Sequence, residues 1–278
     1  MGKLGVCSWS LQPPSPADLA RKVSDVGVKC VQLALDPLRE GRWAAEETLT
    51  ILANTGVEIR SGMMAMRGED YSTLESIRQT GGVRMDQHWA ENLAAAGENG
   101  RIARRLGIHL VTFHAGFLPH ERGDALRQLM IERLRAIIDR LAEHGVRVGF
   151  ETGQESADTL LDILDELDRP AAGVNYDPAN MILYGMGDPV EALRRLAPRV
   201  VQIHIKDAMA TTAPGTWGRE VPVGTGQVDW PAFFGVIRQK RLGCDLMIER
   251  EAGHDRIRDA RRAREVVERS LGTEELRN

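Results

Sequence analysis

The sequence contains few cysteines. Only Cys7, Cys30 and Cys244 occur among its 278 residues, an odd number at positions far apart in the chain. Each lies in an apolar run of strand length, which is typical of a buried structural thiol. We therefore expect three free thiols, and a reducing cytoplasm as the location of the protein.

Neither sign of charge is in large excess. Lys and Arg total 36 and Asp and Glu total 40, which gives a net charge of -4. Such a chain has no general attraction for nucleic-acid backbones or anionic membranes. No apolar run approaches the ~20 residues that span a bilayer, and the first residues enter a strand pattern without a signal-peptide core. We therefore expect no export, no membrane or nucleic-acid partner, and a small-molecule substrate.

Short apolar runs alternate with longer segments whose apolar residues follow a helical spacing, and this pattern predicts parallel strand–helix units. Because the runs are continuously apolar, we expect strands covered by helices on the outside. Eight units in a chain of this length predict a closed (β/α)8 barrel, a TIM barrel of the α/β class, as one domain over residues 1–278. The predicted strands are Leu4–Trp9, Cys30–Leu35, Val57–Met64, Leu110–His114, Val148–Glu151, Gly173–Asp177, Val200–Ile205 and Asp245–Glu249.

The segments between these runs predict helices and two unusual connections. Glycines that stand just before five strands are typical of helix ends with a positive φ; they are Gly27, Gly56, Gly107, Gly145 and Gly243. Residues 69–100 predict a helix with an inserted turn around Gly81 and Gly82. Residues 211–228, rich in Gly, Thr and Pro, predict a loop over the barrel end where active sites are built. The main predicted helices are Ser15–Val26, Ala125–His144, Thr159–Leu167, Pro189–Leu196, Trp230–Lys240 and Arg256–Ser270.

Four consecutive strands end in a polar side chain that could bind a metal. These residues are Glu151, Asp177, His204 and Glu249, with separations of 26, 27 and 45 residues. Taken alone, such a carboxylate is as often a helix cap, and a lone histidine is more often structural. Together at one barrel mouth, three carboxylates would repel one another unless a cation lay among them. Oxygen ligands with one imidazole favour Mn²⁺, Co²⁺ or Mg²⁺ over a closed structural zinc site, although Zn²⁺ also remains open.

Other polar and aromatic residues near the strand ends are candidates for substrate binding. His114 ends the fourth strand and points to the mouth, and Lys206 lies two residues beyond His204 on the same strand face. A structural role for His114 and a helix-capping ion pair for Lys206 remain the alternatives. Trp217 and Trp9 could cover the pocket, since sugars stack on aromatic rings, but both could equally be core residues.

The motifs around these residues resemble the xylose-isomerase-like barrels. That family includes sugar and sugar-phosphate epimerases, hydroxypyruvate isomerase, inosose dehydratase and endonuclease IV. The resemblance rests on Phe150–Glu151, Tyr176–Asn180, His204–Ala208, Gly224–Trp230 and Ile248–Glu251. It implies that Glu151, Asp177, His204 and Glu249 hold one divalent metal, and that Glu151 and Glu249 are also the catalytic acid/base pair. Family members are often dimers or tetramers, so the resemblance also admits a homo-oligomer.

The sequence departs from the tagatose-type epimerases at two positions. Those relatives place a substrate-binding His where this chain has Asn180, and an Arg where it has Ala210. Asn180 remains a candidate for substrate binding. The chain therefore resembles the broad sugar phosphate isomerase/epimerase group more closely than the free-ketose epimerases.

The expected function is isomerisation or epimerisation of a small sugar, keto-sugar or sugar phosphate, with proton transfer through a metal-stabilised enediolate. The alternative is a metal-dependent dehydratase or lyase on the same site, acting on a keto-sugar or inosose. A DNA-repair endonuclease is disfavoured because the chain has only seven His and a negative net charge. A binding protein with a decayed site is disfavoured because all four presumed ligands are present.

Overall fold

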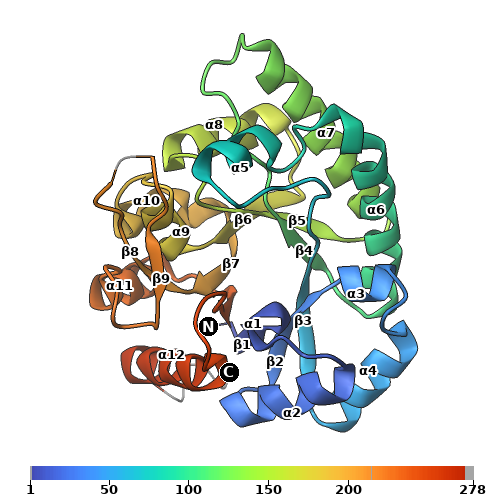
Figure 1. Ribbon diagram of the computed structural model, residues 1–278, viewed down its shortest axis with the longest axis vertical. Coiled ribbons are helices and arrows are strands. Elements are labelled where there is room, and N and C mark those ends of the chain that lie inside the picture. Colours follow the sequence, from blue (N-terminus) through green and yellow to red (C-terminus); the bar gives the residue numbers. More distant parts are fainter. Residues whose placement is uncertain (1, 214, 273–278) are drawn as a thin grey trace.

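The computed structural model describes residues 2–213 and 215–272, and its strands form a closed parallel barrel (Figure 1). The order around the barrel is β1, β10, β7, β6, β5, β4, β3, β2, and every neighbouring pair is parallel. This confirms the predicted TIM barrel. The barrel strands are β1 (Leu4–Cys7), β2 (Cys30–Ala34), β3 (Glu58–Met63), β4 (Leu110–Phe113), β5 (Arg147–Glu151), β6 (Ala172–Tyr176), β7 (Val200–Ile205) and β10 (Asp245–Ile248).

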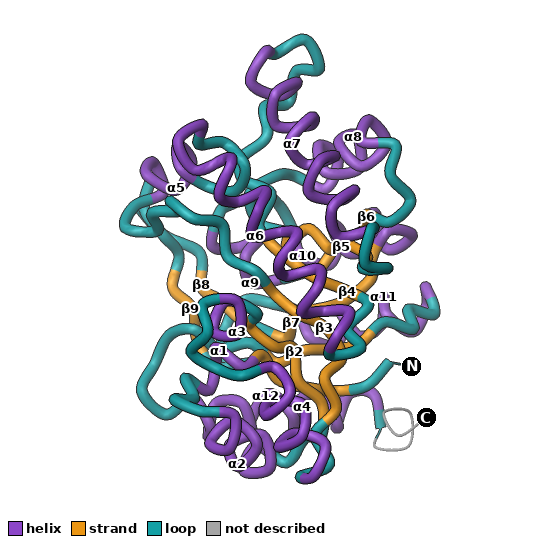
Figure 2. The backbone as a smooth tube through the Cα atoms, turned by 90° about the vertical axis from the view of Figure 1, so that its right-hand side faces the viewer, coloured by secondary structure: helices purple, strands orange, loops and turns teal. Residues whose placement is uncertain are grey.

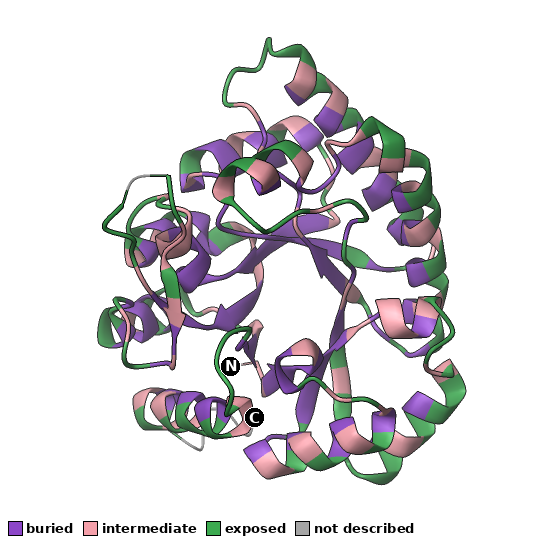
Figure 3. Cartoon of the chain, in the orientation of Figure 1, coloured by how far each residue is buried: buried purple, intermediate pink, exposed green. Residues whose placement is uncertain are grey.

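Helices surround the barrel and turn their apolar faces inward, as the burial colours of Figure 3 show. Several begin at a capping side chain, such as Ser15, Ser156 and Asp188, which accepts a hydrogen bond from the first helical turn. The outer helices are α2 (Pro16–Val26), α4 (Ala45–Asn54), α6 (Asp86–Arg105), α7 (Ala125–Ala142), α8 (Ala157–Leu167), α10 (Pro189–Leu196), α11 (Trp230–Lys240) and α12 (Arg256–Leu271). Shorter helices are α1 (Ser8–Leu11), α3 (Asp36–Arg39), α5 (Leu74–Thr80), α9 (Pro178–Leu183) and the 3-10 turn Ala197–Arg199.

The predicted helix and strand bounds agree with the structure to within a few residues. The inserted turn at Gly81 and Gly82 is confirmed, because it separates α5 from α6. The helix α11 ends at Lys240 as predicted, but the positive φ expected at Gly243 is wrong: Arg241, with a φ of 53°, takes that conformation. The single domain over residues 1–278 stays a prediction, and Met1 and residues 273–278 lie outside the described residues.

The connection after β7 is more ordered than a loop. β8 (Asp207–Met209) pairs antiparallel with β9 (Arg219–Val221), and the side view of Figure 2 shows this hairpin at the same barrel end as α1, α3 and α5. The buried Asp207 carboxylate fixes the segment that follows β9 against β8. It accepts hydrogen bonds from the backbone N–H groups of Ala208, Gly224, Gly226 and Val228 and from the indole of Trp230.

Gly226 is required by this close approach to Asp207. A Cβ atom at position 226 would lie 2.1 Å from Asp207 Oδ1, so any larger residue would displace the turn. The prediction of a loop over residues 211–228 is wrong for the three residues of β9, whereas its predicted position over the barrel mouth is correct.

Within residues 2–213 and 215–272, no helix is both long and apolar enough to cross a membrane.

Candidate active site

The barrel brings the four predicted metal ligands into one buried cluster. Glu151 ends β5, His204 lies in β7, and Asp177 and Glu249 directly follow β6 and β10. Their exposed fractions are 3%, 0%, 0% and 2% in the order Glu151, Asp177, His204, Glu249. One ligand atom from each residue lies within 4.8 Å of those of the others. Parallel strands end at one mouth, and this explains why residues spread over almost a hundred positions converge.

The distances within the cluster fit a shared cation. His204 Nδ1 lies 3.3 Å from Glu249 Oε2, 3.5 Å from Glu151 Oε1 and 3.8 Å from Asp177 Oδ2. Ligand atoms about 2.1 Å from a metal are about 3.0 to 4.2 Å apart. His204 Nδ1 and Asp177 Oδ2 are buried without a hydrogen-bond partner among the described residues. Since buried polar atoms are normally satisfied, both atoms are suited to a ligand placed between them.

A hydrogen-bonded network behind His204 sets the orientation of its ring. Gln32 donates its amide N–H to Thr112 Oγ1 at 2.7 Å, so the amide oxygen of Gln32 faces His204 Nε2 at 2.8 Å. Asn175 Nδ2 lies 3.1 Å from the same Nε2 atom, so two amide groups hold this edge of the ring and Nδ1 faces the carboxylates. Cys7 also donates to Gln32 Oε1, so this thiol belongs to the network behind the ring.

The carboxylates are ionised because positive groups lie beside them. Burial would raise the pKa of Glu249, but Lys206 and His204 lower it to about 2. Burial likewise opposes ionisation of Asp177, but Lys206 and His204 lower its pKa below the usual value. Lys206 Nζ lies 2.9 Å from Glu249 Oε2. Three carboxylates beside one ammonium leave excess negative charge, which a divalent cation would neutralise.

Protons and cations compete for the imidazole of His204. Burial alone would lower the pKa of His204, but Glu249 and the neighbouring carboxylates raise it well above the usual range. The same attraction favours a metal at Nδ1, and cation binding then requires loss of any proton from that atom. The four residues therefore fit a divalent metal in geometry, in charge and in unpaired atoms.

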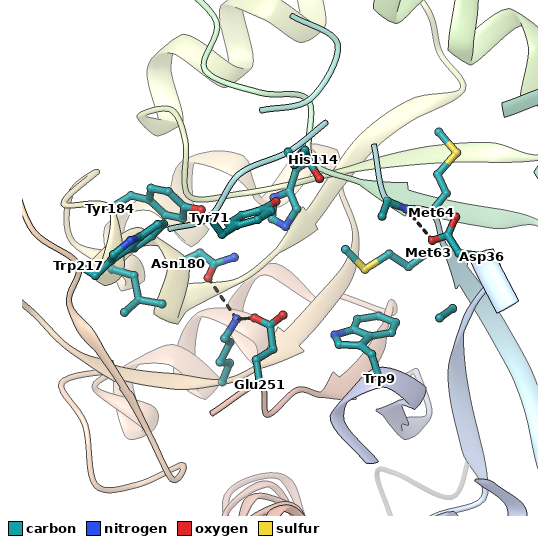
Figure 4. Close-up of a pocket in the computed structure, with 15 residues that line it drawn as sticks. Trp9, Asp36, Met63, Met64, Tyr71, His114, Asn180, Tyr184, Trp217 and Glu251 are labelled. Carbon is teal, nitrogen blue, oxygen red and sulfur yellow. Dashed lines mark hydrogen bonds and ion pairs between the residues drawn. The ribbon is translucent and has the colours of Figure 1, made fainter. Parts of the chain in front are cut away.

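A pocket of about 420 Å³ opens directly above the cluster (Figure 4). Its size falls within the range of about 300 to 1,000 Å³ that is typical of small-molecule sites. All four predicted substrate-binding residues line it: His114, Asn180, Lys206 and Trp217. Their binding roles stay predictions. The other lining residues are Trp9, Ala34, Asp36, Met63, Met64, Ala65, Glu69, Tyr71, Leu183, Tyr184 and Glu251.

Three lining residues connect the pocket to the cluster. The Trp9 indole donates to Glu249 Oε1 at 2.7 Å, and Asn180 Nδ2 donates to Glu151 Oε1 at 3.0 Å. His114 Nε2 lies 3.6 Å from Glu151 Oε1. A molecule in the pocket would therefore contact groups that touch both glutamates.

The sequence analysis did not identify the pocket wall that is formed by residues from the β2 and β3 ends of the barrel. Asp36, Glu69 and Tyr71 come from the segments after β2 and β3, which have no polar strand-end pattern like that of β5, β6 and β7. Met63 is the last residue of β3. Glu251 also lines the mouth and pairs with Lys206 at 2.6 Å. The loop residues could have been identified only if the paths of the loops after β2 and β3 had been known.

The hairpin supplies the last wall of the pocket. The Trp217 ring packs edge-on against Tyr184, with ring centroids 4.9 Å apart. Trp217 Nε1 and His114 Nδ1 are buried and have no hydrogen-bond partner among the described residues. Both groups are therefore suited to hydrogen bonds with a polar molecule in the pocket.

Comparisons with known proteins place these features in a family. A family model described as a xylose isomerase-like TIM barrel matches residues 20–270. The crystal structure of a xylose isomerase domain protein from Planctomyces limnophilus is 31% identical, with a TM-score of 0.82 and 89% of each chain covered. The structure of an L-ribulose 3-epimerase has a TM-score of 0.75 at 16% identity, over 98% of this chain and 95% of that one, which shows the shared fold.

One relative is named for a different activity. A stretch of 120 residues is 28% identical to 3-oxo-isoapionate decarboxylase from Pectobacterium atrosepticum. The match covers 42% of this chain and 43% of the decarboxylase, so it spans less than half the length of that relative.

Proposed function

Because the chain belongs to the xylose isomerase-like TIM barrel family, we propose that it isomerises or epimerises a small sugar, keto-sugar or sugar phosphate. The reaction would move a proton at the carbon next to the substrate carbonyl. The observation that carries this proposal is the pair of buried, ionised glutamates, Glu151 and Glu249, which end strands separated by β6 and β7 in the barrel order. Their carboxylates approach the cluster from two sides, as two-sided proton transfer requires.

Each glutamate has a neighbour that can hold or share a proton. Glu249 contacts the Lys206 ammonium and the Trp9 indole, and Glu151 contacts Asn180 and lies beside His114. One carboxylate would remove the proton from one side of the substrate, and the other would return a proton from the opposite side. Asn180 and Trp9 would fix the carboxylate orientations, because each donates to one glutamate oxygen.

Glu151, Asp177, His204 and Glu249 would together hold one divalent metal, with Mn²⁺, Co²⁺ or Mg²⁺ as the candidates and Zn²⁺ also admitted. When bound, this metal would act as a Lewis acid that stabilises negative charge on the substrate oxygens. The residues' own contribution is to exclude water from the barrel floor and to hold the two glutamates beside the reacting carbon. The fold shared with an L-ribulose 3-epimerase is consistent with this chemistry.

A lyase is the second candidate, favoured by the partial match to a decarboxylase. The same pocket could promote loss of water or carbon dioxide if the leaving group were next to the carbon that loses its proton. A panel of ketoses, ketose phosphates, inososes and 3-oxo acids, incubated with the protein and Mn²⁺, separates the two candidates. NMR and mass spectrometry of the products should show an isomer of unchanged mass.

A product lighter by one water or one carbon dioxide would instead establish the lyase. Glu249→Gln is the matched control, because the amide keeps the side-chain shape but cannot accept the proton. If the wild-type protein converts no member of the panel, or if Glu249→Gln retains full activity, the proposed function is wrong.

A further inference from the structure

The pocket has an unusual charge pattern for an enzyme of sugar phosphates. Among the described residues that line it, Lys206 is the one lysine or arginine, whereas Asp36, Glu69 and Glu251 supply carboxyl groups. Asp36 already pairs with Arg39 at 2.7 Å, and Arg39 is not part of the lining. A phosphate is normally bound by arginine, lysine or a helix N-terminus with several free donors. Beyond Lys206, the described lining residues offer one further group that can carry positive charge, the His114 imidazole, and its Nε2 already lies 3.6 Å from Glu151 Oε1.

The ammonium of Lys206 has no hydrogen left for a phosphate. Its Nζ donates to Asn180 Oδ1 at 3.3 Å, to Glu249 Oε2 at 2.9 Å and to Glu251 Oε2 at 2.6 Å. An ammonium has three donors, so these three contacts use all of them. A phosphate that took one donor would have to displace a carboxylate and would then lie beside it. The mutual repulsion would be large because Lys206 is buried.

The remaining lining is suited to an uncharged, hydroxyl-rich molecule. Carboxylates only accept hydrogen bonds, and hydroxyl groups can donate to them, whereas a fully ionised phosphate cannot. Four rings also face the cavity, those of Trp9, Tyr71, Tyr184 and Trp217 (Figure 4). Such rings pack well against the C–H faces of a sugar or cyclitol.

Building on the proposed function, we propose that the part of the substrate lying in this pocket, away from the four-residue cluster, is uncharged and carries no phosphate. The substrate class is then a free ketose, keto-sugar or keto-cyclitol. The preference for uncharged over phosphorylated substrates comes from two features. All three donors of the Lys206 ammonium are already in hydrogen bonds, and the carboxylate of Glu251 lies at the mouth. Glu251 is thus a specificity-determining residue that disfavours anionic substrates.

The test compares free ketoses with the same ketoses phosphorylated at the terminal carbon, in the presence of Mn²⁺. Binding is followed by the fluorescence of the tryptophans that line the pocket, and turnover by NMR. We expect the free sugars to bind at least ~100-fold more tightly, since a like charge placed in a desolvated site costs several kcal/mol. Binding decides the inference even if no isomer forms, whereas absence of any isomer from sugars that do bind would reject only the proposed reaction.

Two variants test the cause of the selectivity. Glu251→Gln removes the negative charge at the mouth, so it should reduce the preference for free sugars over phosphorylated ones by ~10-fold, chiefly through tighter binding of the phosphates. Glu47→Gln is the matched control, because Glu47 is exposed on α4 and does not line the pocket; its preference should equal that of the wild type. The inference is overturned if phosphorylated sugars bind the wild type as tightly as the free ones, if neither form binds, or if Glu251→Gln leaves the preference unchanged.

Discussion

The Asp207 carboxylate should be the single side chain that keeps the β8–β9 hairpin in place over the pocket. Replacing it in Asp207→Ala removes the acceptor for five N–H groups, and three of these bonds are fully buried. A buried donor left without a partner costs about 1 to 3 kcal/mol. The hairpin lies near solvent and can move to hydrate some donors, so we expect the lower end, about 3 kcal/mol lost from the free energy of unfolding.

The effect of Asp207→Ala on the hairpin and on substrate binding should be larger than its effect on the stability of the whole protein. Trp217 lies between β8 and β9, so loosening the hairpin removes one pocket wall and should raise KM more than it lowers kcat. Asp207 donates no ligand to the four-residue cluster, and metal affinity should remain within about 3-fold of the wild type. Urea denaturation, hydrogen exchange of residues 211–228 and metal titration measure these three effects separately.

Asp229→Ala is the matched control for this prediction. Asp229 caps α11 through one hydrogen bond to the Ala232 N–H, so its loss should cost only about 1 kcal/mol and leave exchange of the hairpin unchanged. If Asp207→Ala unfolds within 1 kcal/mol of the wild type and its hairpin exchanges no faster, the reasoning about this carboxylate is refuted.

Three further predictions concern the cluster and a buried carboxyl group. His204→Ala should weaken metal binding by at least ~10-fold, or ~1.4 kcal/mol, and equal affinity in a calorimetric titration would remove His204 from the ligand set. Gln32→Met should weaken metal binding by ~10-fold, because the His204 ring loses a partner that orients it, and equal affinity in a metal titration would contradict the network. Burial raises the pKa of Glu155 to about 8, so the stability that this group contributes is complete below its unfolded pKa of about 4.5 and is lost as pH rises through 8. Glu155→Gln should therefore gain about 3 to 5 kcal/mol relative to the wild type between pH 5 and pH 8, and parallel stability curves for the two proteins would show that Glu155 is not buried as a neutral acid.

The barrel could be predicted from the sequence because its signals are local and repeated. Continuous apolar runs recur once per strand–helix unit, and neighbouring strands pair in parallel around the whole barrel. The four cluster residues could be predicted to converge for the same reason, since each stands at the end of its strand. The end of α11 shows the limit of such rules, because Arg241 takes the left-handed conformation although Gly243 is two residues away.

The pocket wall that contains Glu69 and Tyr71 could not be predicted in this way. Glu69 and Tyr71 reach the cavity from the segment between β3 and α5, whose path depends on packing against residues distant in sequence. Glu69, for example, accepts a hydrogen bond from the Gly82 N–H in the turn before α6. The β8–β9 hairpin depends likewise on Asp207, whose partners lie 17 to 23 residues further along the chain, apart from Ala208. Such contacts between segments carry no periodic signal.

Solvent deuterium incorporation tests the central claim most directly. In D₂O, conversion of a substrate by two-sided proton transfer should place deuterium at the carbon next to the carbonyl. Glu151→Gln and Glu249→Gln should each stop net conversion, with metal content measured first because both residues are proposed ligands. A metal-loaded single variant that still exchanges the proton on one face, without forming product, would identify the remaining glutamate as a working base. Product formed by the wild type without any deuterium at that carbon would contradict the account, since it would require a direct hydride shift between neighbouring carbons in place of proton transfer by Glu151 and Glu249.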